Sequence, residues 1–191
     1  MPSDLRERIL QEATTLFANQ GYAATSMRTV AEAVGCTKPA LYYHFSNKEE
    51  LFLEAVGTNM NQFTALIEQT LSQPGTLHER LLAGMRTFFT YIQHRPESMR
   101  LLMTAQHRPD EGSPEIDLIS LHQEQSRMLI DILKHARQQG EIRDNVDLCQ
   151  LSTSLDGLIQ IWGMRCVHGQ PIPEKTPEHI LDLFFHGVAP T

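Results

Sequence analysis

The chain has 191 residues, of which 41% are hydrophobic and 20% charged, and its formal net charge is −7 at pH 7. This composition is ordinary for a folded globular protein and excludes a disordered chain, which would hold fewer apolar and more charged residues. No run approaches the roughly 18 uncharged apolar residues of a membrane span, and the N-terminus lacks the regions of a secretory signal, so we expect a cytoplasmic protein.

Apolar residues recur at helical spacing along the whole chain, and strand-like alternation is almost absent. The pattern predicts an all-α fold of about nine helices. The first helix should end at Gly21, which suits the residue that follows a helix. Thr25 or Ser26 can cap a second helix, which is expected to stop at Gly35.

A short third helix is expected between about Lys38 and Phe45, because Pro39 suits a first helical turn. The sequence SNKE then resembles a capping box that begins at Ser46 and opens a long fourth helix to about residue 72. Gly57 lies within that helix as a candidate bend.

Cap residues also predict where the later helices begin and end. The expected boundaries are a helix from Thr76-x-x-Glu79 to Pro96, a polar loop over 108–114, a long helix from Ser113-Pro114 to about Gly140, a helix from Asp147 to about Gly169, and a last helix from Thr176-Pro177 to near Val188.

The second and third helices have the spacing of a helix-turn-helix. Ala31 supplies a small residue where the helices touch, Gly35 tolerates the positive φ of the turn, and Leu41 faces back from the second helix of the pair. Leu41 and Phe45 are four apart and should point inward together. The same spacing is compatible with an ordinary helical hairpin, so it favours a DNA-binding unit only weakly by itself.

The outward face of the predicted third helix makes the case stronger. Lys38, Tyr42 and Tyr43 are left facing out with His44 beside them, and such groups suit contacts with phosphates and base edges. Within residues 25–48, Arg28, Lys38 and Lys48 are opposed by the single acid Glu32, which makes this window locally +2 in an acidic chain.

The sequence GYAATSMRTVAEAVGCTKPALYYHFSNKEELF resembles the N-terminal DNA-binding region of the TetR (tetracycline repressor) family. The resemblance covers about residues 4–55. It implies a helix-turn-helix DNA-binding domain at 1–46, followed by a larger helical effector-binding and dimerisation domain at 47–191. The implied function is a ligand-responsive transcriptional repressor that binds a palindromic operator as a homodimer and is released by a small-molecule effector.

The resemblance also implies which residues contact double-stranded DNA. The set is Thr25, Arg28, Thr37, Lys38, Pro39, Ala40, Tyr42, Tyr43, His44 and Lys48. In it, Thr25 is also a candidate helix cap, and Lys48 acts with the amides that begin the fourth helix as a phosphate clamp. The tip of the third helix carries two apolar residues, Pro39 and Ala40, where many relatives have Gly or Ser. These two side chains leave few direct hydrogen bonds to bases. The alternative for each side chain is a solvated surface residue or a cap.

The C-terminal region offers candidates for two further surfaces. A second apolar face on the last two helices predicts a dimer interface, with the alternative that this face is buried inside one subunit. The interface candidates are Ser154, Gly157, Ile161, Ile180, Phe184 and Val188. Methionine and aromatic residues can line an adaptable effector pocket, but for any single one of them ordinary core is the favoured alternative. The pocket candidates are Met85, Phe88, Phe89, Met103, His107, His122, Gln125, Trp162 and Arg165.

No motif for a metal, cofactor or catalytic site is present. Nine histidines form no HExxH or His-x-x-His pair, three cysteines form no CxxC, and P-loop, GxSxG and GxGxxG motifs are absent. We therefore predict no enzyme, cofactor, metal or membrane partner. The alternative is an all-helical enzyme or small-molecule carrier whose hairpin only resembles a DNA-binding unit.

Overall fold

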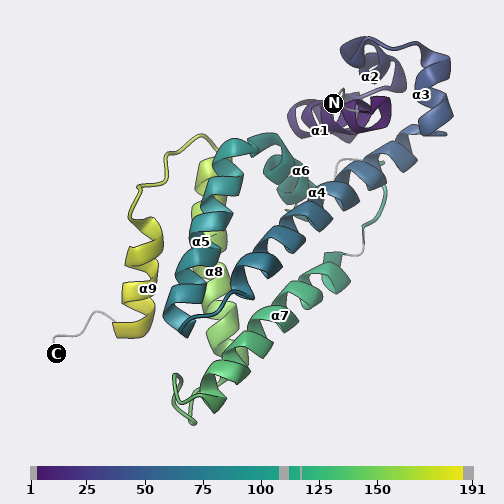
Figure 1. Cartoon of the computed structure of the whole chain (residues 1–191). Coiled ribbons are helices and arrows are strands. Elements are labelled where there is room, and N and C mark those ends of the chain that lie inside the picture. Colours follow the sequence, from purple (N-terminus) through teal and green to yellow (C-terminus); the bar gives the residue numbers. More distant parts are fainter. Residues whose placement is uncertain (1–3, 108–111, 117, 187–191) are drawn as a thin grey trace. The chain divides into compact units, whose positions relative to one another are not determined.

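The computed structural model describes residues 4–107, 112–116 and 118–186, without the side chains of 106–107 and 118–125. In this part of the chain nine helices and no strand are found, which confirms the predicted all-α fold (Figure 1). The helices are α1 (Leu5–Ala24), α2 (Met27–Val34), α3 (Lys38–His44), α4 (Lys48–Leu71), α5 (Leu77–His94), α6 (Pro96–His107), α7 (Leu118–Gln138), α8 (Leu148–Val167) and α9 (Thr176–His186). None of them is long and apolar enough to cross a membrane.

The chain divides into two compact units. The first takes the described residues of 1–62 and 95–117, and the second those of 63–94 and 118–191. The helix α4 contributes residues to both. The predicted division after residue 46 separates a DNA-binding part from an effector-binding part, and it stays a prediction.

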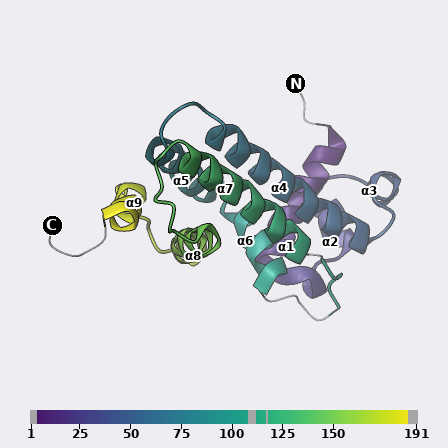
Figure 2. The same cartoon turned by 90° about the horizontal axis from the view of Figure 1, so that it is seen from below.

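In the first unit, α1, α2 and α3 gather around the beginning of α4, and α6 packs on α1 (Figure 2). Ile9, Leu41, Phe45 and Leu51 are fully buried at its centre. The predicted inward direction of Leu41 and Phe45 is therefore confirmed. Burying such side chains removes apolar surface from water, which stabilises the unit by roughly 1.5–3 kcal/mol for each one.

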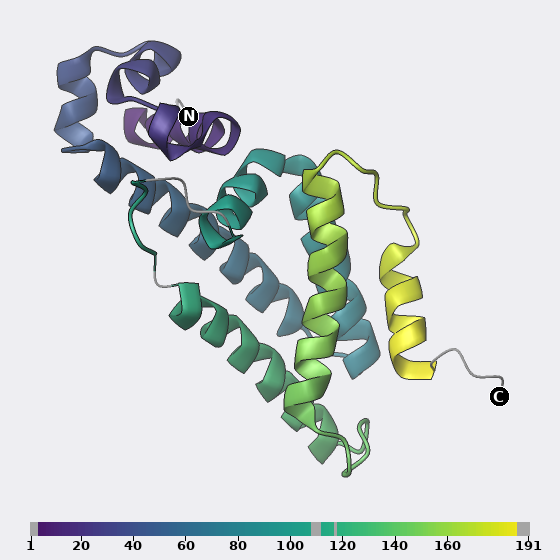
Figure 3. The same cartoon turned by 180° about the vertical axis from the view of Figure 1, so that it is seen from behind.

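In the second unit, α8 packs against both α5 and α7 (Figure 3). Gly163 makes this packing close, because a Cβ there would meet Phe88 Cζ at 3.0 Å and Ile92 Cδ1 at 3.2 Å. The helix α9 lies along α5, and an ion pair between Arg86 and Glu178 joins the two. The hydrogen bond that Arg86 donates to Glu178 within this ion pair is the main reason that the pKa of the Glu178 carboxyl is lowered.

Of the two candidates for the N-cap of α2, the structure selects Ser26, so Thr25 is not the cap. Two other helix starts differ from the prediction. The long fourth helix begins at Lys48, because Asn47 Oδ1 accepts from Glu50 N at 2.8 Å while Glu50 Oε2 accepts from Ser46 N at 2.7 Å. The capping arrangement is thus one residue later than SNKE. Residues 113–116 are not helical, and the next helix starts at Leu118.

Other predicted features are confirmed. Thr76 and Glu79 form the expected reciprocal cap, with Thr76 N donating to Glu79 Oε2 at 2.9 Å and Glu79 N donating to Thr76 Oγ1 at 3.2 Å. Asp147 caps α8, and Thr37 caps α3 with Pro39 in its first turn. The helix α4 runs through Gly57 without interruption, and the predicted end near Val188 lies outside the described residues.

Candidate nucleic-acid interface

The turn between α2 and α3 is fixed by backbone hydrogen bonds around Gly35. Gly35 has φ 71°, the left-handed region that glycine adopts without steric cost. Its N–H donates to Glu32 O at 3.2 Å, and the N–H of Cys36 donates to Ala31 O at 3.0 Å. These two bonds form a Schellman motif, which satisfies the last carbonyls of α2 and turns the chain toward α3.

The helix α3 has one fully buried face and one open face. Leu41 and Phe45 have no exposed surface, whereas Tyr42 is 49% and Tyr43 86% exposed. Lys38 and Pro39 are exposed at the beginning of the same helix. The ring of His44 meets the ring of Tyr43 edge-on, with centroids 5.2 Å apart. Burial on one face therefore fixes α3 and leaves its aromatic and cationic groups available to a partner.

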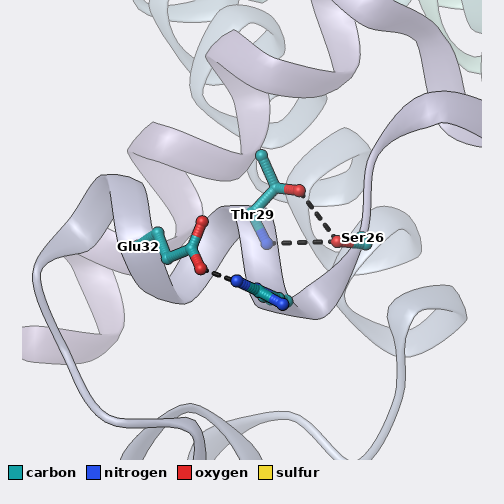
Figure 4. A network of polar contacts seen from close by, with 4 residues as sticks. Ser26, Thr29 and Glu32 are labelled. Atoms are coloured by element: carbon teal, nitrogen blue, oxygen red, sulfur yellow. Dashed lines mark hydrogen bonds and ion pairs between the residues drawn. The ribbon is translucent and has the colours of Figure 1, made fainter.

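The beginning of α2 carries a second group of exposed polar side chains. Ser26 Oγ accepts from Thr29 N at 3.1 Å and lies 2.8 Å from Thr29 Oγ1 (Figure 4). Arg28 is exposed and donates from Nε to Glu32 Oε1 at 2.7 Å, which raises the pKa of its guanidinium. The exposed hydroxyl at this helix start is therefore that of Ser26, and Arg28 follows two residues later.

Thr25 occupies a different place from the one implied by the resemblance. It is 1% exposed, and its hydroxyl donates to Gly21 O at 2.8 Å. Gly21 has φ 81° and ψ 170°, so the regular course of α1 breaks there. The hydroxyl of Thr25 therefore satisfies the backbone carbonyl of Gly21, at the point where α1 breaks.

Lys48 is held by Tyr22. Its Nζ donates to Tyr22 O at 2.9 Å and lies 4.0 Å from the centroid of the Tyr22 ring. That ring contacts Phe52 edge-on at 5.0 Å and stacks with Phe17 at 6.0 Å. Burial and the carboxylate of Glu49 raise the pKa of Tyr22. The ammonium group at the beginning of α4 is thus attached to the end of α1.

The predicted effector residues are only partly brought together. Phe88 and Phe89 have ring centroids 5.4 Å apart, and the guanidinium of Arg165 lies 4.9 Å from the Trp162 ring centroid. Met85 and Phe89 are nearly fully buried, as ordinary core would be. Met103 and His107 belong to the first unit, whereas the other candidates belong to the second. The side chains of His107, His122 and Gln125 lie outside the described residues.

The predicted interface residues divide into exposed and buried groups. Ser154, Gly157 and Ile161 are exposed on α8, whereas Ile180 is 3% exposed within the single chain. Ile180 therefore belongs to the core of the second unit, because α9 packs against α5, and its assignment to the interface is corrected. Phe184 is half-buried, and Val188 lies outside the described residues.

Sequence reasoning missed three residues of this interface. Asn47 carries the cap that we assigned to Ser46, and both are good capping types, so the sequence alone does not separate them. Tyr22 holds Lys48 from 26 positions away, for which the sequence offers no periodic signal. Thr29 bonds Ser26, and the Ser-x-x-Thr spacing at the start of α2 was the signal that could have indicated it.

Comparison with known proteins places this geometry in a family. The family model for bacterial regulatory proteins of the tetR family matches residues 9–55, which span the helix-turn-helix and the beginning of α4. The transcriptional repressor ComR of Escherichia coli K12 is 30% identical over 159 residues, covering 81% of this chain and 76% of that protein. The chain belongs to the tetR family. It is a DNA-binding transcriptional regulator.

Further relatives agree with this membership. The repressor KstR2 of Mycolicibacterium smegmatis is 28% identical over 148 residues, covering 77% of this chain and 72% of that protein. The structure of the TetR family regulator PfmR from Thermus thermophilus has 26% identity and a TM-score of 0.76, covering 96% of this chain and 100% of that one. The predicted class, a DNA-binding transcriptional regulator, is confirmed, and the alternative of an enzyme or carrier is not favoured. Among the described residues no cluster of His, Cys, Asp or Glu could hold a metal ion.

Proposed function

We propose that this tetR family protein represses transcription as a homodimer on a palindromic operator and is released by a small molecule. The exposed face of α3 carries the proposal. Tyr42 and Tyr43 are open to solvent on a helix that Leu41 and Phe45 fix from behind. Exposed aromatic hydroxyls on a rigidly supported two-turn helix suit a groove and its phosphates better than they suit a solvated surface.

The DNA-contacting residues follow from exposure and charge. Arg28 and Lys38 supply cations, and Tyr42, Tyr43 and His44 supply groups that can bond phosphates and groove edges. Thr37 contributes through its exposed position at the N-cap of α3, and Pro39 and Ala40 meet base edges through apolar contact. Few base-directed hydrogen bonds are available at that tip, so sequence-dependent DNA shape contributes to site choice.

Dimerisation is proposed through the exposed face of α8. Ser154, Gly157, Leu158, Ile161 and Met164 follow one another at intervals of one to three residues on a single face and are all exposed in the single chain. Small residues at 154 and 157 allow a second helix to approach closely, and Ile161 with its apolar neighbours supplies area to bury. A two-fold dimer can then place two copies of α3 on half-sites about 34–36 Å apart.

Release by an effector is proposed through α4, which contains residues of both units. A small molecule that binds the second unit more tightly in one arrangement of α4 shifts the population toward that arrangement. Candidate contacts are the aromatic and methionine residues of α5 and α8, with Phe88 only half-buried and Arg165 exposed beside Trp162. The protein is expected to act in the cytoplasm, where operator DNA is accessible.

The proposal is tested by selecting duplexes from a random pool on the purified protein. A palindromic consensus and a dimer-to-duplex ratio of one support it. Compounds that raise the melting temperature of the protein are then tested for release of the selected duplex. A protein that enriches no duplex at low salt is not the proposed regulator, and a compound that binds tightly without changing duplex affinity argues against the release mechanism.

A further inference from the structure

The contact between Lys48 and Tyr22 points to a role for Lys48 that differs from phosphate binding. We propose that Lys48 is a positioning residue, whose ammonium group fastens the beginning of α4 to the end of α1 and thereby sets the placement of the DNA-binding helices. This inference rests on the proposed DNA-binding function. It replaces the prediction that Lys48 is a phosphate clamp.

The end of α1 presents two groups that attract a cation, the backbone carbonyl and the ring of Tyr22. Because α1 breaks at Gly21, Tyr22 O does not continue a regular helical ladder, and it accepts from Thr25 N at 3.3 Å and from Lys48 Nζ at 2.9 Å. Carbonyls at a helix C-terminus carry partial negative charge, and the face of an aromatic ring does too. Lys48 Nζ lies 4.0 Å from the Tyr22 ring centroid and thus meets both.

The place of Lys48 in α4 supports the same conclusion. Lys48 is the first residue of the helix, the end at which a positive charge is disfavoured by the helix dipole. The neighbouring acids Glu49 and Glu50 suit that end, and Glu50 is engaged with Ser46 N. A lysine at this position is explained by what it bonds at the end of α1.

The aromatic cluster around Tyr22 makes this attachment rigid. The Tyr22 ring contacts Phe52 of α4 and Phe17 of α1, and Phe17 and Phe52 meet each other edge-on at 5.1 Å. Phe17 is 1% and Phe52 5% exposed. The ammonium of Lys48 therefore sits over a ring that is itself fixed between the two helices it joins.

Salt dependence separates positioning from phosphate contact. Each phosphate neutralised by a cation contributes roughly −0.9 to the slope of log K against log salt. Lys48→Met keeps the length of the side chain and removes its charge. If Lys48 only positions, the variant binds the selected duplex about tenfold more weakly, as for loss of one charge-assisted hydrogen bond, with an unchanged slope. If Lys48 grips phosphate in both subunits, the slope becomes less steep by about 1.8.

Lys38→Met is the matched control, because Lys38 is exposed on α3 and carries the same charge. It should flatten the slope where Lys48→Met does not. A double-mutant cycle with Tyr22→Leu adds a second test, since that change keeps the carbonyl and removes the ring. Lys48→Met and Tyr22→Leu should weaken binding less than additively.

The outcomes are distinct. A flattened slope for Lys48→Met, or full additivity with Tyr22→Leu, overturns the positioning role while leaving the DNA-binding function intact. Failure of the wild-type protein to bind any duplex instead overturns the proposed function. If Tyr22→Leu does not fold, the slope of Lys48→Met alone decides the question.

Discussion

Arg28 donates a hydrogen bond to Glu32 one helical turn later, with Nε 2.7 Å from Oε1. Both side chains are largely exposed, so solvent screening leaves the pair little influence on stability. If Arg28 binds a DNA phosphate as proposed, the carboxylate of Glu32 competes with that phosphate for the same guanidinium. Glu32 is the one acid opposing three cations in the window 25–48.

Glu32→Gln should therefore strengthen DNA binding several-fold, since it frees Arg28 and removes a negative charge from the DNA-facing side. Fluorescence anisotropy with a selected duplex measures the change. Glu174→Gln alters the net charge equally at an exposed position of the second unit and should leave affinity nearly unchanged. If Glu32→Gln and Glu174→Gln strengthened DNA binding equally, the gain in affinity would come from net charge alone.

Adjacent residues of α3 should respond in opposite ways. Leu41→Ala removes a fully buried side chain and should destabilise the protein by about 2–5 kcal/mol. Tyr42→Ala and Tyr43→Ala alter exposed side chains and should leave the melting temperature nearly unchanged while weakening DNA binding at least tenfold together. Thermal unfolding and anisotropy titrations on the same preparations separate the two effects. Normal DNA binding by the double tyrosine variant would refute the assigned face.

Alanine substitutions at Gly35 and Gly57 form a matched pair that tests the conformation of the turn between α2 and α3. A Cβ at either position meets nothing within 4 Å, so only backbone conformation distinguishes them. Gly35→Ala should destabilise by about 1 kcal/mol because its φ is 71°. Gly57→Ala lies inside α4 and should stabilise by roughly 0.5–1 kcal/mol. Melting temperatures that move in the same direction would contradict this account of the turn.

The α8 face gives a prediction about assembly. Ile161→Glu places a charge on a side chain that is 53% exposed in the single chain, so the folded monomer should tolerate it while the dimer should not. Sedimentation velocity should show a monomer with an unchanged circular dichroism spectrum. Ile180→Ala is the contrasting variant, and it should lower stability without dissociating the dimer. If the Ile161→Glu protein remained a dimer, the dimer interface would not be the exposed face of α8.

The cap at the beginning of α5 predicts a pH dependence. Hydrogen bonds from the backbone and side chain of Thr76 lower the pKa of Glu79 in the folded protein. A lowered folded pKa means that the charged form is favoured by folding, so this contribution is present above the unfolded pKa and is lost as pH falls through the folded value. Glu79→Ala should therefore be less stable than wild type near pH 7. The difference should shrink as the pH is lowered below about 4. A difference that stays constant down to about pH 3 would contradict the assignment.

Local patterns predicted most of the helices because cap residues and apolar spacing act over a few positions. Leu41 and Phe45 were assigned correctly to the buried face since a four-residue interval fixes their direction. The start of α4 was misplaced by one residue because Ser46 and Asn47 are both capping types. Ile180 was misassigned because a helix apolar on two faces does not reveal which one its own chain covers.

Contacts across long separations were beyond sequence reasoning. The resemblance made Lys48 a phosphate contact, whereas the folded chain places its ammonium on Tyr22, which lies 26 residues earlier. Thr25 was likewise implied as a DNA contact, and folding buries it against Gly21 O. Both contacts lie at the end of α1, next to the break at Gly21.

The central claim is that the open face of α3, with Arg28, binds duplex DNA. It is tested most directly by measuring the affinity of wild type and Tyr42→Ala for a selected duplex over a series of salt concentrations. Two to four phosphates neutralised by Arg28 and Lys38 in a dimer predict a wild-type slope of log K against log salt between about −2 and −4. Tyr42→Ala should keep this slope with weaker binding, because it removes no charge. A flat salt dependence, or unchanged affinity for Tyr42→Ala, would contradict the account.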